Sequence, residues 1–240
     1  MNALHRGLGW ACLIFALLGS PSVWAQGQEA HIKKTLTERL TNFPRIEEVR
    51  RTPMTGLYEV RTEGNEIFYT DTEANHLIQG DLIDTRQKRN LTEERLEKLS
   101  MIDFSKLPTK DAFTIVQGNG LRKMAVFVDP NCGYCKRFER DLQKVENVTI
   151  HVFLYPVLGQ DSVEKSKNIW CAKDRGKTWQ DWMLRGQTPA AAQCDTAAIE
   201  RNLEFGRKNR ITGTPTTYTS QGNRVTGAVA GVGEIGRAHV

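Results

Sequence analysis

The sequence lacks the compositions that characterise disulfide-rich, collagen-like and disordered proteins. Five cysteines in 240 residues are too few for a small scaffold held together by disulfides. The 20 glycines and 8 prolines follow no period, which excludes collagen-like and low-complexity chains. With 39% hydrophobic residues and a formal net charge of +5, the chain is not mainly disordered. It is long enough for one large domain or two small ones.

A basic patch for nucleic acid and a cluster of metal ligands are also missing. Lysine and arginine alternate with aspartate and glutamate along most of the chain, so we expect a solvated surface of mixed charge and no nucleic-acid partner. The histidines lack the spacing of metal ligands. We therefore predict no metal and no cofactor. The histidines are His5, His31, His76, His151 and His239.

Residues 1–25 are typical of a secretory signal peptide. The apolar run Trp10–Leu18 is too short for a transmembrane helix, which needs about 20 residues. Val23-Trp24-Ala25 has small residues at the two positions that a signal peptidase inspects, so we expect cleavage after Ala25. The mature chain should be periplasmic and not inserted in a membrane. It keeps four of the five cysteines, because Cys12 leaves with the signal, and an even number suits an oxidising compartment.

Residues 26–89 are predicted to form a small amino-terminal domain without cysteine. Apolar residues at spacings of three and four predict a helix from Ala30 to Phe43, ended by Pro44. Strands and a turn follow, and a domain of this size often pairs with a second copy. Residues 90–109 are predicted to be a linker helix that begins near Asn90, a residue type that caps helices. The predicted strands are Leu57–Val60 and Glu66–Thr70, joined at Gly64-Asn65, and two pieces of His76–Asp84 broken at Gly80.

Residues 110–240 alternate strand and helix patterns. A strand–helix–strand unit predicts parallel strands with a right-handed crossover. A long helical stretch from about Val163 to Arg207 is predicted next, followed by a hairpin through Gln221–Arg224. The strand–helix–strand unit consists of Met124–Val128, Lys136–Val145 and Val148–Leu154, and the hairpin begins with strand Thr216–Thr219.

Cys132 and Cys135 lie between a predicted strand and a predicted helix. Two intervening residues, Gly133 and Tyr134, place the two sulfurs one helical turn apart. Cys132 would meet the helix N-terminus, which favours a thiolate, and Cys135 would be more buried and act as the resolving thiol. Half of a zinc site or an inert disulfide has the same pattern. No second C-x-x-C occurs in the sequence, so we favour redox chemistry.

Four segments spread over nearly the whole chain resemble one family. Two of them are Phe127-Val128-Asp129 running into the C-G-Y-C motif and Ile169–Asp174, which contains Cys171. The other two are Gly213-Thr214-Pro215, similar to the cis-proline loop of thioredoxin folds, and His76–Gly80. Together they resemble the DsbC-type periplasmic protein disulfide isomerases of the thioredoxin superfamily. A departure is Pro130-Asn131, where the family more often has an apolar residue and threonine.

The resemblance implies an architecture and a set of partners. The first domain would be an α+β dimerisation domain of cystatin-like fold, joined by the linker helix to an α/β thioredoxin-fold domain with a helical insertion. Two subunits would form a homodimer with an apolar cleft that holds unfolded, misoxidised exported proteins. A membrane reductant of DsbD type would keep the dithiol reduced. The implied activity is isomerisation of incorrect disulfides with chaperone-like binding. A DsbG-like thiol reductase or oxidase of narrow clientele and a non-catalytic chaperone are the alternatives.

The resemblance also implies roles for individual residues. Cys132 should be exposed and ionised so that it can attack a substrate disulfide. Gly133, Tyr134, Thr214 and Pro215 would tune the site or bind substrate. Cys171 and Cys194 would form a structural disulfide worth about 3 kcal/mol. Two further expectations concern residues nearby: Asp129 caps the helix or shuttles protons, and Trp170, Trp179 and Trp182 belong to the core.

The carboxyl-terminal residues do not resemble the end of a thioredoxin fold. Members of this family finish with a helix that covers the sheet, whereas Gly227–Gly233 is rich in glycine, a poor helix former. The final heptapeptide Glu234–Val240 looks like a translated sequencing adapter. We expect that the natural chain continues beyond Gly233 and that the chain as given is unstable; a short natural tail is the alternative.

Overall fold

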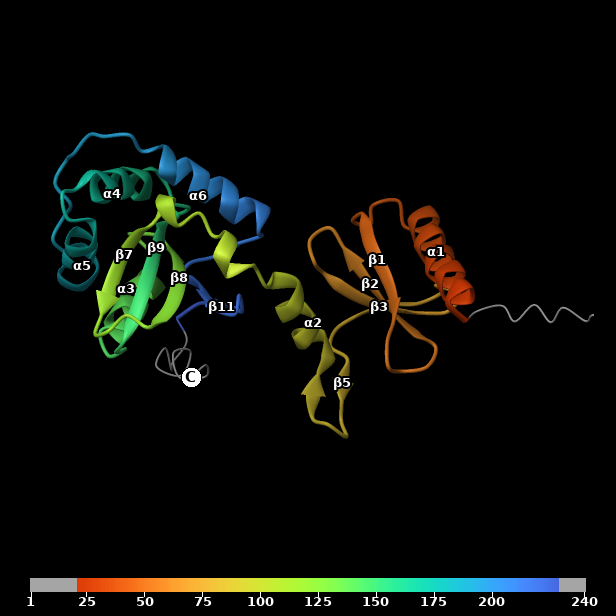
Figure 1. Ribbon diagram of the computed structural model, residues 1–240. Coiled ribbons are helices and arrows are strands. Elements are labelled where there is room, and N and C mark those ends of the chain that lie inside the picture. Colours follow the sequence, from red (N-terminus) through yellow and green to blue (C-terminus); the bar gives the residue numbers. More distant parts are fainter. Residues whose placement is uncertain (1–20, 229–240) are drawn as a thin grey trace, which may run out of the picture. The chain divides into compact units, whose positions relative to one another are not determined.

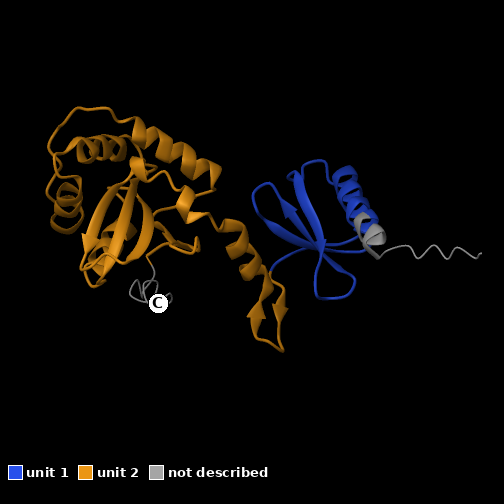
Figure 2. Ribbon diagram, in the orientation of Figure 1, with its two compact units in different colours: residues 1–80 blue, residues 81–240 orange. Residues whose placement is uncertain are grey.

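The chain divides into two compact units, residues 1–80 and 81–240 (Figure 2). The computed structural model describes residues 21–228. Most of the predicted signal peptide and the predicted adapter-derived Glu234–Val240 lie outside the described residues. Within residues 21–228, no helix is both long and apolar enough to cross a membrane.

The first unit packs one helix on an antiparallel sheet with the strand order β1-β2-β3-β4 (Figure 1). Ile32 and Leu36 of the helix are 0% and 2% exposed and pack against Val60 and Phe68 of the sheet. The predicted strands and the Gly64-Asn65 turn are confirmed; Asn65 has a φ of 59°, in the left-handed region. The elements are α1 (Pro21–Arg39), β1 (Ile46–Arg51), β2 (Leu57–Thr62), β3 (Ile67–Asp71) and β4 (Leu77–Gln79).

The predicted extent of the first helix is wrong at both ends. Within the described residues the helix extends from Pro21, earlier than the predicted start at Ala30. It ends at Arg39, before the predicted end at Phe43. The Phe43 ring instead lies edge-on to Phe68, with ring centroids 5.0 Å apart. The apolar residue at 43 therefore completes the core from a loop.

Strand β1 is not predicted by the sequence because most of its residues are charged. Three of these charged residues, Glu47, Glu48 and Arg50, are paired with residues of the neighbouring strand β2. Arg50 donates two hydrogen bonds, of 2.7 and 2.5 Å, to the carboxylate of Glu59 on β2, which is 2% exposed. Arg61 of β2 pairs with Glu48 at 3.0 Å. Cross-strand ion pairs of this kind stabilise neighbouring strands without leaving an alternating apolar pattern.

A short hairpin and the linker helix open the second unit. The hairpin consists of β5 (Ile83–Asp84) and β6 (Arg89–Asn90), and the helix is α2 (Leu91–Ser100). Asn90 caps α2 as predicted and accepts hydrogen bonds of 3.1 Å from the amides of Thr92 and Glu93. The amide of Leu82 donates to Thr92 Oγ1 at 2.8 Å, which ties the hairpin to the helix. The division between the two compact units falls after Gly80, so the hairpin and α2 belong to the second unit.

The second unit is built on a five-stranded sheet with the order β11-β10-β8-β9-β7. Strands β8 and β9 run parallel, as predicted, and the predicted hairpin joins β10 to β11. Strand β7 pairs antiparallel with β9 and was not predicted. Two 3₁₀ turns, Phe104–Lys106 and Thr109–Asp111, precede the sheet. The strands are β7 (Phe113–Gln117), β8 (Arg122–Val128), β9 (Val148–Leu154), β10 (Thr216–Thr219) and β11 (Arg224–Thr226).

Alternation along the central strands divides the core into two layers. Val126 and Val128 of β8 pack with Cys132, Cys135 and other residues of one cluster on one face of the sheet. Phe127 packs in a second cluster on the other face, where its ring stacks on Phe205 at 5.5 Å. Successive side chains of a strand point to opposite faces of the sheet. Because residues Met124–Val128 of β8 are apolar without interruption, both faces of this strand must be covered, as they are here.

The predicted single helical stretch from Val163 to Arg207 is wrong: three helices occupy it. Asp174 caps the second helix by accepting a 2.9 Å hydrogen bond from the amide of Lys177. Gly186 ends that helix in the left-handed conformation, with a φ of 70°. The predicted helix Lys136–Val145 also begins earlier. The helices are α3 (Gly133–Leu142), α4 (Gln160–Cys171), α5 (Arg175–Arg185) and α6 (Ala197–Lys208).

Candidate active site

The two free cysteines lie where three segments meet at one end of the sheet. The C-x-x-C motif follows β8, the 155–159 loop follows the parallel strand β9, and Thr214-Pro215 precedes β10. The strand register places these ends together: Val128 is opposite Leu154, and Phe127 is opposite Thr216. The carboxyl ends of parallel strands are the usual position of sites in open α/β sheets.

Cys132 is the N-cap residue of α3. Its sulfur accepts a 3.2 Å hydrogen bond from the Cys135 amide and lies 3.3 Å from the Thr214 carbonyl oxygen, to which it can donate. The Thr214–Pro215 peptide bond is cis. Cys132 is 5% exposed and Cys135 1% exposed. The expectation that Cys132 is exposed is therefore wrong: its side chain is buried, with the sulfur against the Thr214 carbonyl oxygen.

The environments of the two thiols shift their pKa values in opposite directions. The hydrogen bond with the Cys135 side chain, together with those from Thr214 and the amides of α3, lowers the pKa of Cys132 to about 6. Burial raises the pKa of Cys135 far above its ordinary value, and the neighbouring Cys132 thiolate adds to the rise. The pair can therefore hold one thiolate, on Cys132, while the second thiol stays protonated.

We expect alkylation of the reduced protein by iodoacetamide to follow this lowered pKa. Above pH 6 the Cys132 thiolate predominates, so the rate should rise through a midpoint near pH 6 and level off above about pH 7. At pH 7 roughly 90% of Cys132 would be ionised, against about 1% of a thiol with a pKa of 9. The measurement is the alkylation rate against pH, with the label located by mass spectrometry. A midpoint above pH 8, or label on Cys135, would contradict the assignment.

The other predicted site residues divide into two groups. Gly133 begins α3, Tyr134 is 67% exposed beside Cys132, and Thr214 is half-buried next to buried Pro215. Cys171 and Cys194 belong elsewhere: they form a disulfide with an S–S distance of 2.05 Å that joins the end of α4 to the loop before α6. The structure thus places the first group at the dithiol and the Cys171–Cys194 disulfide in the helical insertion.

Asp129 does not cap α3, which is one of the two roles expected for it. It is fully buried, and its carboxylate does not cap α3, whose cap is Cys132. Oδ1 accepts hydrogen bonds from the Asn131 amide at 2.8 Å and from Ser162 Oγ at 2.7 Å. Oδ2 accepts from the amides of Val157 and Leu158 at 2.8 and 3.0 Å. Asp129 therefore holds the dithiol loop, the 155–159 loop and the start of α4 together.

Replacing Asp129 by asparagine should destabilise this end of the sheet. The amide has a single oxygen, so it leaves buried N–H donors unpaired at a cost of about 1–3 kcal/mol each. We expect Asp129→Asn to lower the free energy of unfolding by about 2 kcal/mol in urea denaturation. The control is Asp161→Asn, because the Asp161 side chain is 68% exposed and its loss should change stability little. Equal effects of the two variants would contradict the role given to Asp129.

Trp182 packs against the core cluster, as expected, and also contacts the dithiol loop. Trp170 and Trp179 are buried, as expected, but Trp182 is only half-buried. Its Nε1 donates a 2.6 Å hydrogen bond to the carbonyl oxygen of Pro130, two residues before Cys132. The ammonium groups of Lys136 and Lys165 lie 4.4 and 4.9 Å from its ring centroid. Helical spacing alone could not reveal this contact between α5 and the dithiol loop.

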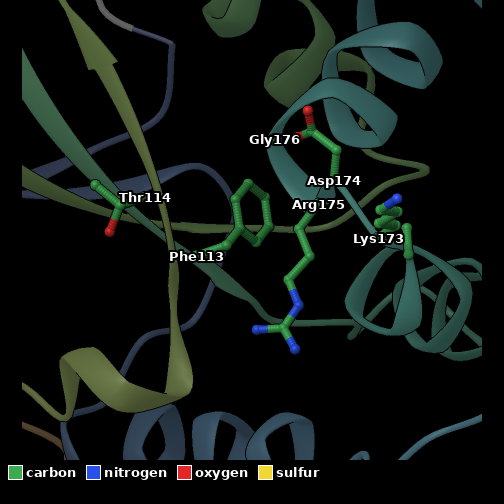
Figure 3. A pocket seen from close by; sticks show the side chains of 7 residues that line it. Phe113, Thr114, Lys173, Asp174, Arg175 and Gly176 are labelled. Carbon is green, nitrogen blue, oxygen red and sulfur yellow. The ribbon is translucent and has the colours of Figure 1, made fainter.

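A hollow of about 660 Å³ lies away from the dithiol, between β7 and the start of α5. Figure 3 shows Phe113 and Arg175 at its wall. The Arg175 guanidinium is engaged with Trp170, 3.9 Å from its ring centroid. None of the lining residues is a cysteine or a neighbour of the C-x-x-C motif. Among residues 21–228, no group of three or more histidine, cysteine, aspartate or glutamate side chains could hold a metal ion.

Comparison with known proteins decides the family. Residues 24–93 match the disulfide bond isomerase protein N-terminal domain, and residues 109–232 match the thioredoxin-like domain. The probable thiol:disulfide interchange protein DsbC of Bordetella parapertussis is 46% identical over 198 residues, which cover 82% of this chain and 70% of the relative. The chain belongs to the DsbC family.

More distant relatives agree with this membership. DsbC of Escherichia coli is 29% identical over 222 residues, covering 90% of this chain and 89% of the relative. The crystal structure of a disulfide interchange protein from Neisseria gonorrhoeae matches with a TM-score of 0.53 and 34% identity, covering 55% of this chain and 97% of that one. The predicted fold class, an amino-terminal α+β domain followed by a thioredoxin-fold domain, is confirmed. As a DsbC-family member, the protein is a thiol:disulfide oxidoreductase.

Proposed function

We propose that this protein rearranges incorrect disulfides of exported proteins, with Cys132 as nucleophile and Cys135 as resolving thiol. The Cys132 thiolate attacks a substrate disulfide, which forms an enzyme–substrate disulfide and releases one substrate thiolate. That thiolate can attack a second substrate disulfide, and the substrate thiolate displaced there can attack the enzyme–substrate disulfide. The correct pairs then form and Cys132 leaves as a thiolate without net oxidation. Alternatively, Cys135 attacks Cys132, which releases a reduced substrate and leaves the dithiol oxidised.

The contrast between the two thiols is the observation that carries this proposal. A pKa of about 6 keeps Cys132 ionised at neutral pH, and a thiolate of low pKa is also a good leaving group. The raised pKa of Cys135 keeps the resolving thiol protonated, so the mixed disulfide persists long enough for the substrate to rearrange. Thr214, Pro215, Gly133 and Tyr134 line the approach to Cys132 and contact the substrate.

The amino-terminal domain makes the protein a homodimer. Strand β4 lies at an edge of the sheet, and its Ile78 is 55% exposed. An exposed edge strand with an apolar residue is a template for pairing with a second copy. Residues 26–89 are then the dimerisation domain, 90–109 the linker that contains helix α2, and 110–240 the catalytic domain. Chaperone-like binding of unfolded chains between the two subunits belongs to the same proposal.

Export and reduction complete the proposed cycle. The protein works in the periplasm after cleavage behind Ala25, where disulfides persist. The oxidised dithiol needs two electrons to return to the active form, and a membrane reductant of DsbD type supplies them. The Cys171–Cys194 disulfide takes no part in the exchange and is structural.

The test uses one multi-disulfide protein as substrate in two forms, one with scrambled disulfides and one fully reduced. With scrambled substrate, the reduced protein should restore activity at catalytic amounts. With fully reduced substrate, the oxidised protein should be a poor catalyst of disulfide formation, since its role is rearrangement. Efficient oxidation without reactivation of the scrambled substrate would favour an oxidase and overturn the proposal.

A further inference from the structure

The 155–159 loop presents two apolar side chains to solvent beside the dithiol. Val157 is 45% exposed and Leu158 is 58% exposed, although the strand that precedes them is buried. Adjacent exposed apolar residues on one loop cost solvation energy, and such surfaces commonly mark an interaction site. We call Val157 and Leu158 the apolar tip.

The exposure of the apolar tip is fixed by hydrogen bonds. Both amide groups of the tip donate to the same oxygen, Oδ2 of Asp129, at 2.8 and 3.0 Å. Since Asp129 is fully buried, the amides point inward and the two side chains cannot fold back over them. The amides are also unavailable to pair with another strand. Recognition at the tip therefore depends on side chains rather than on backbone hydrogen bonds.

The tip and the thiolate are joined through a single residue. The Asp129 carboxylate holds the tip, and the Asp129 carbonyl oxygen accepts a 3.1 Å hydrogen bond from the Cys132 amide. The sheet register places the tip on the β9 side of the dithiol and Thr214 on the β10 side. A polypeptide whose cysteine reaches Cys132 thus has Thr214 on one side and the apolar tip on the other.

The geometry points to a substrate subsite: the apolar tip contacts an apolar side chain next to the cysteine that Cys132 attacks. This inference rests on the proposed function and adds to it a preference for substrate cysteines with apolar neighbours. The occupant is a substrate polypeptide because the loop of the tip and the dithiol loop leave the same end of the sheet and are both held by Asp129. The ammonium groups of Lys136, on the helix of the dithiol, and of Lys165, on α4, are engaged with the Trp182 ring. A misfolded protein exposes cysteines with apolar neighbours, which a native protein buries.

Two short peptides test the preference directly. Each carries one cysteine joined by a disulfide to thionitrobenzoate, with leucine neighbours in the first peptide and serine neighbours in the second. Attack by the Cys132 thiolate on the peptide sulfur forms the enzyme–peptide disulfide and releases the coloured thionitrobenzoate anion. Cys135 then displaces the peptide thiolate and the enzyme disulfide forms. The measured quantity is the second-order rate of colour release in a single turnover.

The reduced protein should react about tenfold faster with the leucine peptide, which corresponds to ~1.4 kcal/mol of contact. In the double variant Val157→Ser/Leu158→Ser the two rates should become equal, at the rate of the serine peptide. The matched control is Leu121→Ser: Leu121 is 77% exposed but precedes β8, at the opposite end of the sheet from the dithiol. This control should keep the full preference.

Each outcome separates the subsite from the proposed function. If the double variant keeps the tenfold preference, or if the unmodified protein shows none, the subsite is refuted while the thiol chemistry stands. If both rates fall in parallel in the double variant, the tip is only structural and the inference is equally refuted. If the unmodified protein releases no colour from either peptide, the proposed function itself fails.

Discussion

Replacing Cys135 by alanine should convert the protein into a trap for its substrates. Cys132 would still be ionised at neutral pH and would still attack, but no second thiol of the enzyme could displace the substrate. We expect enzyme–substrate disulfides that survive non-reducing electrophoresis after incubation with a scrambled protein and that disappear on reduction. Reactivation of the scrambled protein should fall strongly, because each round now depends on the substrate's own thiols for release.

Three control variants make the trapping result specific. Cys132→Ala should abolish both trapping and reactivation, since Cys135 is 1% exposed and its raised pKa keeps it protonated. A double Cys171→Ala/Cys194→Ala variant should still react through Cys132, although with lower stability. Asp141→Asn in α3 changes a half-buried carboxylate, paired with Lys144, on the helix of the dithiol and should leave trapping intact. Covalent complexes that form without Cys132 would disprove the assignment of the nucleophile.

The parts of the fold that could be predicted are those whose signals are local. The parallel pairing of β8 and β9 follows from a buried strand, a helix and a second buried strand in close succession. The cap at Asn90 and the turn at Asn65 depend on one or two residue types each. The position of Cys132 at the N-terminus of α3 follows in the same way, because a strand and a helix must be joined at this motif.

What could not be predicted depends on contacts between distant segments. Strand β1 is held by ion pairs such as Arg50 with Glu59, which leave no apolar period in the sequence. The role of Asp129 becomes visible only when Val157 is brought beside it from 28 residues away. Trp182 has the helical spacing of a core residue, and only the packing of α5 reveals its bond to Pro130. The sequence therefore predicts the two thiols of the site but not the residues that hold them in place.

Removing the first unit should separate disulfide isomerisation from thiol chemistry. The second unit has its own sheet and its own buried clusters, so a chain without residues 26–80 should fold and keep the reactive Cys132. It should sediment as a monomer, because the edge strand β4 is gone. We expect alkylation of Cys132 at pH 7 to be unchanged and reactivation of a scrambled protein to fall by about a hundredfold.

The expected loss follows from effective concentration. In a dimer, a substrate released from one dithiol remains near the second, at an effective concentration on the order of millimolar. In a monomer the released substrate diffuses away, and rearrangement competes with reoxidation in solution. Analytical ultracentrifugation of both chains at micromolar concentration, beside the reactivation assay, measures the two effects together. A full-length chain that sediments as a monomer, or a truncated chain that reactivates the scrambled protein equally well, would refute dimerisation as the origin of isomerase activity.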